Sequence, residues 1–278
     1  MPQTCYRHPD RETAVSCSSC GRPICPDCMT PTPVGMRCPE CSNQRTRVVR
    51  NPTGTPSGLG AFPATMILIA INVVVYLIEI AKGSGGLLGT QPIGIIYEMG
   101  GLFGPAVNEL HQWWRIITSG FVHVSITHIG FNMLLLYFMG RLLEPAIGWL
   151  RFTLLYFVCL VAGSFVALWF SPDTVSAGAS GAIFGVLGAT FIIARGRNME
   201  AVAGQIGFLI IFNLVFTFAD AGISIGAHVG GLVAGVLCGL TIVAGEQGRF
   251  GRENHRAIEL TIMAAIGILS FVLALAVA

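Results

Sequence analysis

The segment Gly178-Ala179-Ser180-Gly181-Ala182-Ile183-Phe184-Gly185 places a serine between glycines, where a polar loop turns into an apolar helix. The glycines allow a backbone or a substrate to approach the Ser180 hydroxyl closely. Because Ser180 begins the helix, its N–H and that of Gly181 are among the unpaired donors of a positive helix end. Such donors can hold a developing oxyanion. The segment therefore indicates either a nucleophile site or a helix cap followed by a packing motif.

The composition indicates a membrane protein with a separate head. Of the 278 residues, 53% are hydrophobic and 11% are charged, whereas soluble domains have roughly 25% charged residues. Seven of the nine cysteines precede residue 42. We therefore expect a cysteine-rich domain over residues 1–44, a flexible linker over 45–61 and a membrane domain over 62–278. The net charge of +2 gives no indication of nucleic-acid binding, and we expect none.

The head carries eight potential metal ligands in four pairs, each pair separated by two residues. The pairs are Cys5 and His8, Cys17 and Cys20, Cys25 and Cys28, and Cys38 and Cys41. Eight ligands suffice for two four-coordinate structural zinc ions. The segment has too few apolar residues for a core of its own, so metal binding would supply the folding energy. A disulfide framework is the alternative, but His8 in the first pair favours metal.

The body contains seven apolar segments that predict membrane-spanning helices. They cover residues 62–81, 121–143, 150–170, 179–194, 203–218, 225–244 and 257–277. A spanning helix needs about 20 residues, so the fourth and fifth segments are short. The sequence therefore predicts an all-α polytopic membrane protein with six spans plus a seventh at the C-terminus.

The basic residues predict the orientation of these spans. Ten arginines lie before the first span or beside the turns that follow the second, fourth and sixth spans. Since basic residues concentrate on the cytoplasmic side, we expect a cytosolic N-terminus and a cytosolic head. Only Lys82 and Arg115 would then lie outside. We expect the chain in a bacterial plasma membrane, surrounded by lipid.

This orientation brings the starts of the second, fourth and sixth spans to the same outer face. These starts carry His128 and Asn132, Ser180, and His228, respectively. Polar and ionisable side chains inside a span are costly and usually face a bundle interior or water. Glycines at every fourth position in the fourth and sixth spans predict close packing of these two helices. We therefore expect Ser180 and His228 to lie close together.

With these residues the sequence resembles the rhomboid family of intramembrane serine proteases over about residues 62–244. The resemblance rests on Gly178-x-Ser180-Gly181, Ala227-His228-x2-Gly231-x3-Gly235, His123-x4-His128-x3-Asn132 and Trp114-Arg115. It implies a Ser180 nucleophile and a His228 base without a carboxylate. It also implies an oxyanion hole from His128, Asn132 and backbone N–H groups at Ser180 and Gly181.

The resemblance implies further features of the chain. Phe184 would stack against His228, and the Trp114-Arg115 loop would be structural. The substrates would be single-span membrane proteins cleaved near the outer face. The head resembles a cross-braced zinc finger of the B-box kind, with the first and third ligand pairs on one zinc and the second and fourth on the other. Such a head could recruit a cytosolic protein partner.

Other readings of the same residues lead to different functions. A proteolytically inactive rhomboid-like protein that binds membrane proteins is the main alternative, and a transporter or channel is another. Asp173 and Asp220 lie in outer loops, where either could orient a histidine, but we expect both to be solvated. We also expect Glu79 to reach water at the outer end of the first span, and Cys159 and Cys238 to be small buried residues.

Overall fold

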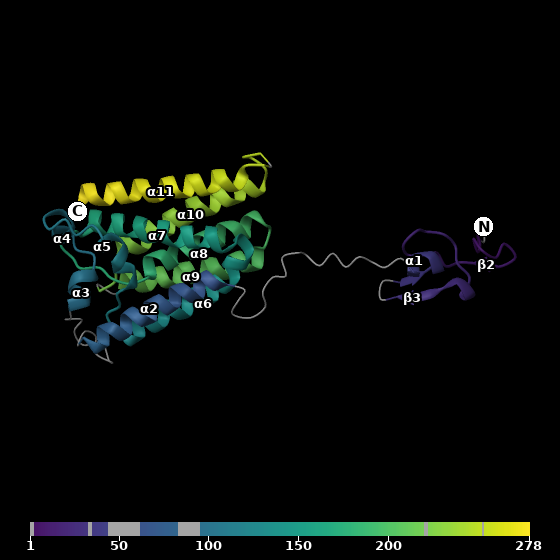
Figure 1. Ribbon diagram of the computed structural model, residues 1–278, viewed down its shortest axis with the longest axis horizontal. Helices are drawn as coiled ribbons and strands as arrows, with labels where there is room; N and C mark the ends of the chain where they lie inside the picture. The colour runs from purple at the N-terminus through teal and green to yellow at the C-terminus, as the bar shows by residue number, and fades with distance from the viewer. Residues whose placement is uncertain (1–2, 33–34, 44–61, 83–94, 220–221, 252) are drawn as a thin grey trace. The chain divides into compact units, whose positions relative to one another are not determined.

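The computed structural model describes residues 3–32, 35–43, 62–82, 95–219, 222–251 and 253–278 (Figure 1). The chain forms two compact units, Met1–Gly54 and Thr55–Ala278. The linker expected over residues 45–61 lies outside the described residues.

The head contains short elements around a core of cysteines. Its two antiparallel hairpins and two single-turn helices are β1 (Gln3–Thr4) with β2 (Glu12–Thr13), β3 (Thr30–Thr32) with β4 (Gly35–Arg37), η1 (Pro26–Cys28) and α1 (Pro39–Asn43). Among the described residues of the head, the buried hydrophobic cluster consists of Ile24 and six cysteines. An apolar core this small cannot hold a folded domain without a further constraint such as a metal.

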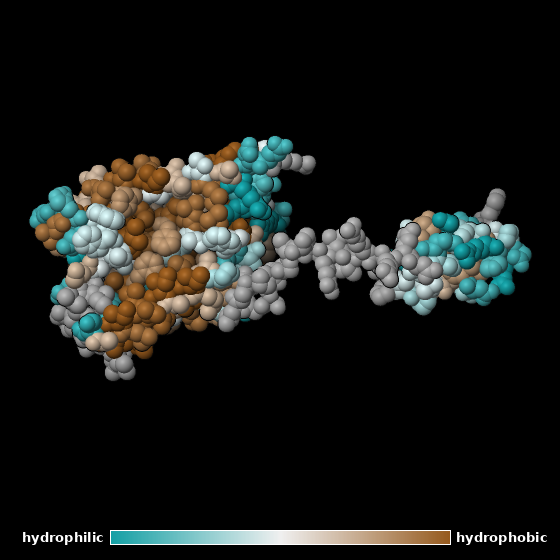
Figure 2. Space-filling model, in the orientation of Figure 1, coloured by the Kyte–Doolittle hydropathy of each residue, from teal (hydrophilic) through white to brown (hydrophobic). Residues whose placement is uncertain are grey.

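The described part of the body contains seven apolar helices that run alongside one another (Figure 1). They are α2 (Pro63–Ala81), α6 (Ile126–Ile147), α7 (Trp149–Phe170), α8 (Ser180–Gly196), α9 (Glu200–Ala219), α10 (Ile225–Glu246) and α11 (His255–Val277). Six of them are long and apolar enough to cross a membrane, and α8 is shorter, with 17 residues. Hydrophobic side chains cover much of the visible face of the body (Figure 2). The chain is therefore a multi-pass integral membrane protein.

Two of the expected spans differ from the helices that form. The fifth was expected to be short, but α9 has 20 residues and is long enough to span a membrane. The helix begins three residues before the expected start, at Glu200, and ends one residue after the expected end, at Ala219. The second span begins at Ile126 rather than at 121, because the Ser125 side chain accepts the N–H of His128 and caps the helix there. His123 consequently precedes the helix.

The short helix α8 is the most enclosed element of the body. Twelve of its 17 residues are buried. A Cβ added to Gly231 would lie 1.9 Å from the carbonyl oxygen of Gly181, and one on Gly235 would lie 2.0 Å from that of Gly185. The backbones of α8 and α10 are therefore in direct contact, which confirms the packing predicted from the spacing of the glycines.

Buried carboxylates join other helices of the body. Glu144 of α6 is 1% exposed and accepts hydrogen bonds from the N–H groups of Ala64 and Thr65, both at 2.8 Å, at the start of α2. The two N–H groups would otherwise be unpaired in an apolar environment. Glu259 of α11 pairs with Arg151 of α7 at 2.8 Å and so links these two helices. The two expected small residues, Cys159 and Cys238, are fully buried.

Between α2 and α6 the described residues form short helices. These are α3 (Ile95–Gly100), α4 (Gly104–Asn108), α5 (Arg115–Thr118) and η3 (Ser119–Phe121). The buried Arg115 guanidinium donates to the carbonyl oxygen of Gly101 at 2.6 Å and to the side-chain oxygen of Gln112 at 2.7 Å. These contacts agree with the structural role expected of this loop.

Replacing Gly235 with alanine tests the contact between α8 and α10. The new methyl group would collide with the Gly185 carbonyl, and overpacking of this kind typically costs about 1–3 kcal/mol. We expect a lower midpoint of thermal unfolding in detergent. Gly204→Ala on α9 is the matched control, because a Cβ at Gly204 meets nothing within 4 Å. Equal midpoints for the two variants would contradict the close contact.

Candidate functional site

Ser180 and His228 meet at the starts of two neighbouring helices. Ser180 is the first residue of α8, and His228 lies in the first turn of α10. The Ser224 side chain accepts the N–H of Ala227 at 3.2 Å and so fixes where α10 begins. The Ser180 hydroxyl oxygen lies 2.7 Å from Nε2 of His228. This arrangement can transfer a proton from the hydroxyl to the imidazole.

The imidazole of His228 is enclosed by side chains from two helices. Its exposed fraction is 6%. The ring of Phe184 stacks on it with centroids 4.2 Å apart, as expected from the resemblance. Its second nitrogen, Nδ1, lies 2.7 Å from the hydroxyl oxygen of Thr217 on α9. The sequence analysis did not identify Thr217. The only signal was a single hydroxyl in an otherwise apolar last turn of the fifth span.

His128 and Asn132 lie beside the loop that leads into Ser180. Gly178 in this loop has a φ of +124°, which side chains rarely adopt. A Cβ on Gly178 would lie 2.6 Å from Cε1 of His128 and 3.8 Å from Nδ2 of Asn132. Nδ2 of Asn132 is buried and has no hydrogen-bond partner among the described residues. An unpaired buried donor is costly, so this N–H is available to an oxygen bound near Gly178.

His123 contacts both the loop that leads into Ser180 and the side chain of Glu79 on α2. Nε2 of His123 lies 3.5 Å from the backbone nitrogen of Ala179, and its ring centroid lies 5.0 Å from that of His128. The carboxylate of Glu79 accepts the backbone N–H of His123 at 3.3 Å. The expectation that Glu79 reaches water is wrong, because its side chain is 1% exposed. The loop before α6 covers it.

The two aspartates that were expected in outer loops, Asp173 and Asp220, have no described contact with His228. Asp173 is exposed, as expected for a solvated loop charge. Asp220 lies outside the described residues. Among the side chains that the structure describes, no carboxylate is a hydrogen-bond partner of His228.

A small recess adjoins the loop that leads into Ser180. Its lining includes Gly178 and Gly181 together with the serines Ser119, Ser164 and Ser176. Hydroxyl groups at such a position can hold water.

The head gathers its eight expected ligands into two sets of four. One set is Cys5, His8, Cys25 and Cys28, and the other is Cys17, Cys20, Cys38 and Cys41. Within each set the ligand atoms all lie within 4.8 Å of one another. These are the two groupings implied by the resemblance to a cross-braced finger.

The distances within the sets fit a tetrahedral metal and not a disulfide. Zinc–ligand bonds of about 2.3 Å to sulfur and 2.0 Å to nitrogen place two sulfurs about 3.8 Å apart and a sulfur and a nitrogen about 3.5 Å apart. The sulfurs of Cys20 and Cys38 are 3.8 Å apart. Nδ1 of His8 lies 3.3 Å from the sulfur of Cys25 and 3.5 Å from that of Cys28. A disulfide requires about 2.05 Å.

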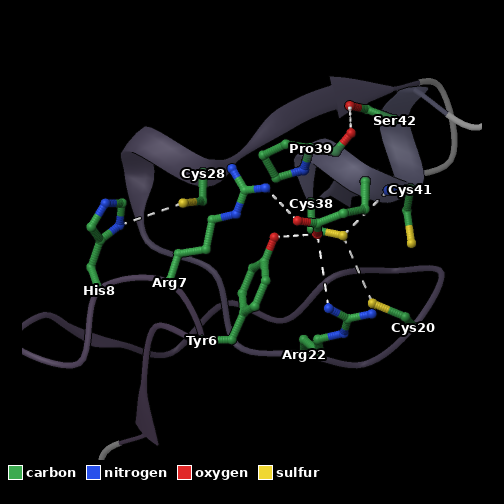
Figure 3. A network of polar contacts seen from close by, with 11 residues as sticks. Tyr6, Arg7, His8, Cys20, Arg22, Cys28, Cys38, Pro39, Cys41 and Ser42 are labelled. Carbon is green, nitrogen blue, oxygen red and sulfur yellow. Dashed lines mark hydrogen bonds and ion pairs between the residues drawn. The ribbon is translucent and has the colours of Figure 1, made fainter.

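A polar network ties the first loop of the head to α1. The Glu40 carboxylate accepts hydrogen bonds from Tyr6 and Arg7, and Arg22 lies 3.9 Å from it. Figure 3 shows these three side chains converging beside Cys38. The hydrogen bond from Tyr6, together with that from Arg7, lowers the pKa of Glu40 to about 2. The network therefore links residues next to one ligand set with residues next to the other.

Comparison with known proteins identifies relatives over most of the body. The family model of the Rhomboid domain matches residues 110–245. Rhomboid protease GluP of Bacillus subtilis is 35% identical over 214 residues, which are 74% of this chain and 40% of GluP. Putative rhomboid protease YdcA of the same organism is 32% identical over 144 residues, which are 50% of this chain and 72% of YdcA.

A third relative has a different description. Inactive RHOMBOID-like protein 8 of Arabidopsis thaliana is 34% identical over 120 residues, which are 43% of this chain and 34% of that protein. The chain thus spans less than half the length of GluP and of this plant protein.

Proposed function

This chain belongs to the rhomboid family, and on that premise we propose that it is an intramembrane serine endopeptidase with Ser180 as nucleophile and His228 as general base. The observation that carries the proposal is the distance of 2.7 Å between the Ser180 hydroxyl oxygen and Nε2 of His228. Two polar side chains rarely meet inside an apolar bundle without a function. Relatives that are named proteases, GluP and YdcA, support the same activity.

The reaction divides into two steps at this pair. His228 takes the hydroxyl proton as the oxygen of Ser180 attacks the carbonyl carbon of a peptide bond. The imidazolium then gives the proton to the leaving amine, and an acyl-enzyme remains. Water then attacks the ester and loses a proton to His228. The imidazolium gives this proton to the Ser180 oxygen as the ester bond breaks, which releases the second product and restores Ser180. The recess lined by Ser119 and Ser164 is a suitable store for this water.

During each step a negative charge develops on the carbonyl oxygen of the substrate, and this oxygen needs hydrogen-bond donors near Ser180. We assign this role to His128, Asn132 and the N–H groups of Ser180 and Gly181. Two observations support the assignment. Nδ2 of Asn132 has no hydrogen-bond partner among the described residues, and a Cβ at Gly178 would lie 2.6 Å from Cε1 of His128. Donors that are already in place need no reorganisation when charge develops, and one such donor typically accounts for a factor of about 10²–10³ in rate.

The position of the pair suggests the substrate class. Ser180 begins a helix of 17 residues, which is shorter than a full span. The site would therefore lie below the membrane surface, on the outer side if the N-terminus is cytosolic. Arg195 and Arg197, at the opposite end of α8, support that orientation. We propose that the substrates are single-span membrane proteins cleaved near their outer end, in a bacterial plasma membrane.

A membrane-protein-binding function without proteolysis is the alternative. Its support is the similarity to Inactive RHOMBOID-like protein 8. The presence of both Ser180 and His228, at hydrogen-bonding distance, favours the protease.

For the head we propose a cytosolic domain of residues 1–44 with two structural zinc ions, joined by residues 45–61 to a protease domain of residues 62–278. The fit of the ligand distances to tetrahedral zinc supports this proposal. Each set is complete with four protein ligands, so neither zinc would take part in catalysis. A role in recruiting a cytosolic protein partner is consistent with a folded head on the cytosolic side.

Cleavage of a single-span membrane substrate by purified protein in liposomes tests the protease proposal. We expect Ser180→Ala and His228→Ala to abolish cleavage, because each removes one partner of the proton transfer. Asn132→Ala should lower kcat about 10²-fold or more through the loss of one oxyanion donor. Thr190→Val, a buried change on α8 away from the site, is the control and should cleave like the wild type.

Full cleavage by Ser180→Ala would exclude this serine as the nucleophile. A folded wild type that captures membrane proteins but cleaves none of them would favour the binding protein.

Metal analysis of the full chain tests the zinc proposal. We expect two zinc ions per chain in the wild type purified without chelator, and one in Cys17→Ser or in Cys5→Ser, because each change removes a thiolate from one set only. Cys159→Ala alters a cysteine outside both sets and should keep two. A wild-type protein without zinc, or a Cys17→Ser variant that keeps both ions, would contradict the assignment.

A further inference from the structure

Thr217 is the residue through which the outer half of α9 enters the bundle. Of the residues of α9, only Ala203, Ile206 and Thr217 are buried in the described structure. Thr217 is 1% exposed, while its neighbours Phe216 and Phe218 are 56% and 66% exposed. The Thr217 hydroxyl therefore points inward, while the phenylalanines on either side of it are exposed.

The hydroxyl of Thr217 has two hydrogen-bond partners, a carbonyl oxygen that can only accept and a ring nitrogen that can donate. Its oxygen lies 2.8 Å from the backbone carbonyl oxygen of Asn213 and 2.7 Å from Nδ1 of His228. A carbonyl oxygen carries no hydrogen. An oxygen–oxygen distance of 2.8 Å is a hydrogen bond only if the Thr217 proton lies between the two atoms. The hydroxyl proton is therefore committed to Asn213.

The hydrogen bond from Thr217 to Asn213 determines which ring nitrogen of His228 is protonated. Because the Thr217 oxygen has no second proton to give, it can only accept, so Nδ1 must carry the hydrogen of the neutral ring. Nε2 is then unprotonated and presents a lone pair to the Ser180 hydroxyl at 2.7 Å. The protons along the chain all point one way, from Ser180 to His228 to Thr217 to Asn213. In this state Ser180 donates to the base.

We propose that Thr217 is a positioning residue that holds His228 in its Nδ1-protonated tautomer and aims Nε2 at Ser180. The proposal deepens the protease function and rests on it. Which ring nitrogen of a histidine carries the proton is set by the hydrogen bond that the other nitrogen makes. In many serine hydrolases a carboxylate makes that bond, but no described carboxylate contacts His228.

A hydroxyl at this position avoids a cost that a carboxylate would bring. A buried carboxylate must be desolvated and paired, which is expensive in an apolar bundle. The Thr217 hydroxyl is neutral and already satisfied by Asn213. It fixes the tautomer without adding a charge to the membrane interior. Since Thr217 belongs to α9 and His228 to α10, an outward displacement of α9 at this level would also release the imidazole.

Nitrogen-15 NMR of the full chain in liposomes, labelled at histidine, tests the tautomer directly. At about pH 8.5 the imidazole is expected to be neutral, and the His228 signals are assigned by their loss in His228→Gln. We expect a protonated Nδ1 and an unprotonated Nε2 in the wild type and in Thr217→Ser, which keeps the hydroxyl. Thr217→Val keeps the shape of the side chain, and both nitrogens should shift towards the average of two tautomers.

Thr190→Val is the matched control for this series. Thr190 is also buried, and its hydroxyl also donates to the backbone carbonyl oxygen four residues earlier, that of Val186, at 2.7 Å. It lies on α8, away from His228. In Thr190→Val the nitrogen-15 signals of His228 should equal those of the wild type. Unchanged signals in Thr217→Val, or a tautomer mixture in Thr217→Ser, would overturn the proposal. The NMR result does not depend on whether the chain cleaves anything.

Kinetics separate this proposal from the protease function itself. We expect Thr217→Val to lower kcat about tenfold with an unchanged KM, as for the loss of one neutral hydrogen bond. Thr217→Ser keeps the hydroxyl and should have the kcat of the wild type. Equal kcat values for Thr217→Val and the wild type, with no cleavage by Ser180→Ala, would remove the role of Thr217 and leave the protease intact. Cleavage by Ser180→Ala would remove the protease mechanism instead.

Discussion

The contact between the backbones of α8 and α10 is the constraint on which the site depends. A Cβ added at Gly231 or Gly235 would lie 1.9 or 2.0 Å from a carbonyl oxygen of α8. That is the distance at which only the hydrogen of a hydrogen bond approaches such an oxygen. No side chain separates the two helices there, so their backbones lie against each other. The register of these glycines also sets the relative height of the two helix starts. A shift by one turn, about 5.4 Å, would separate Ser180 from His228.

The membrane explains why the reactive groups lie at helix starts. Backbone groups in lipid must be paired within the protein, so long irregular segments cannot enter the apolar layer. The first turn of a helix is the exception, because its N–H groups have no partner within the helix. Ser125 and Ser224 satisfy part of this need in α6 and α10. The N–H groups at the start of α8 have no such serine cap, and in the proposed mechanism they are available to a substrate oxygen.

The sequence predicts those parts of the molecule that depend on local pattern and on topology. Apolar length predicted the spans, glycine spacing predicted the contact between α8 and α10, and ligand spacing predicted four pairs of potential metal ligands. The division of these pairs into two sets was implied by the resemblance to a cross-braced finger. It missed what depends on contacts between residues that are distant in the chain. Thr217 looks like an ordinary hydroxyl bonded to its own helix, and only the fold brings it to His228. Glu79 appeared to be near an aqueous end, but the loop at His123 covers it.

Identification of the residue that reacts with a fluorophosphonate tests the central claim most directly. Such a probe forms a covalent bond with a serine that has been activated by a base, and mass spectrometry of the digested full-length chain locates that bond. The account predicts a single adduct on the peptide that contains Ser180, with reaction strongly slowed in His228→Ala. An adduct on any other serine, or equal labelling of Ser180 in the presence and absence of His228, would contradict it.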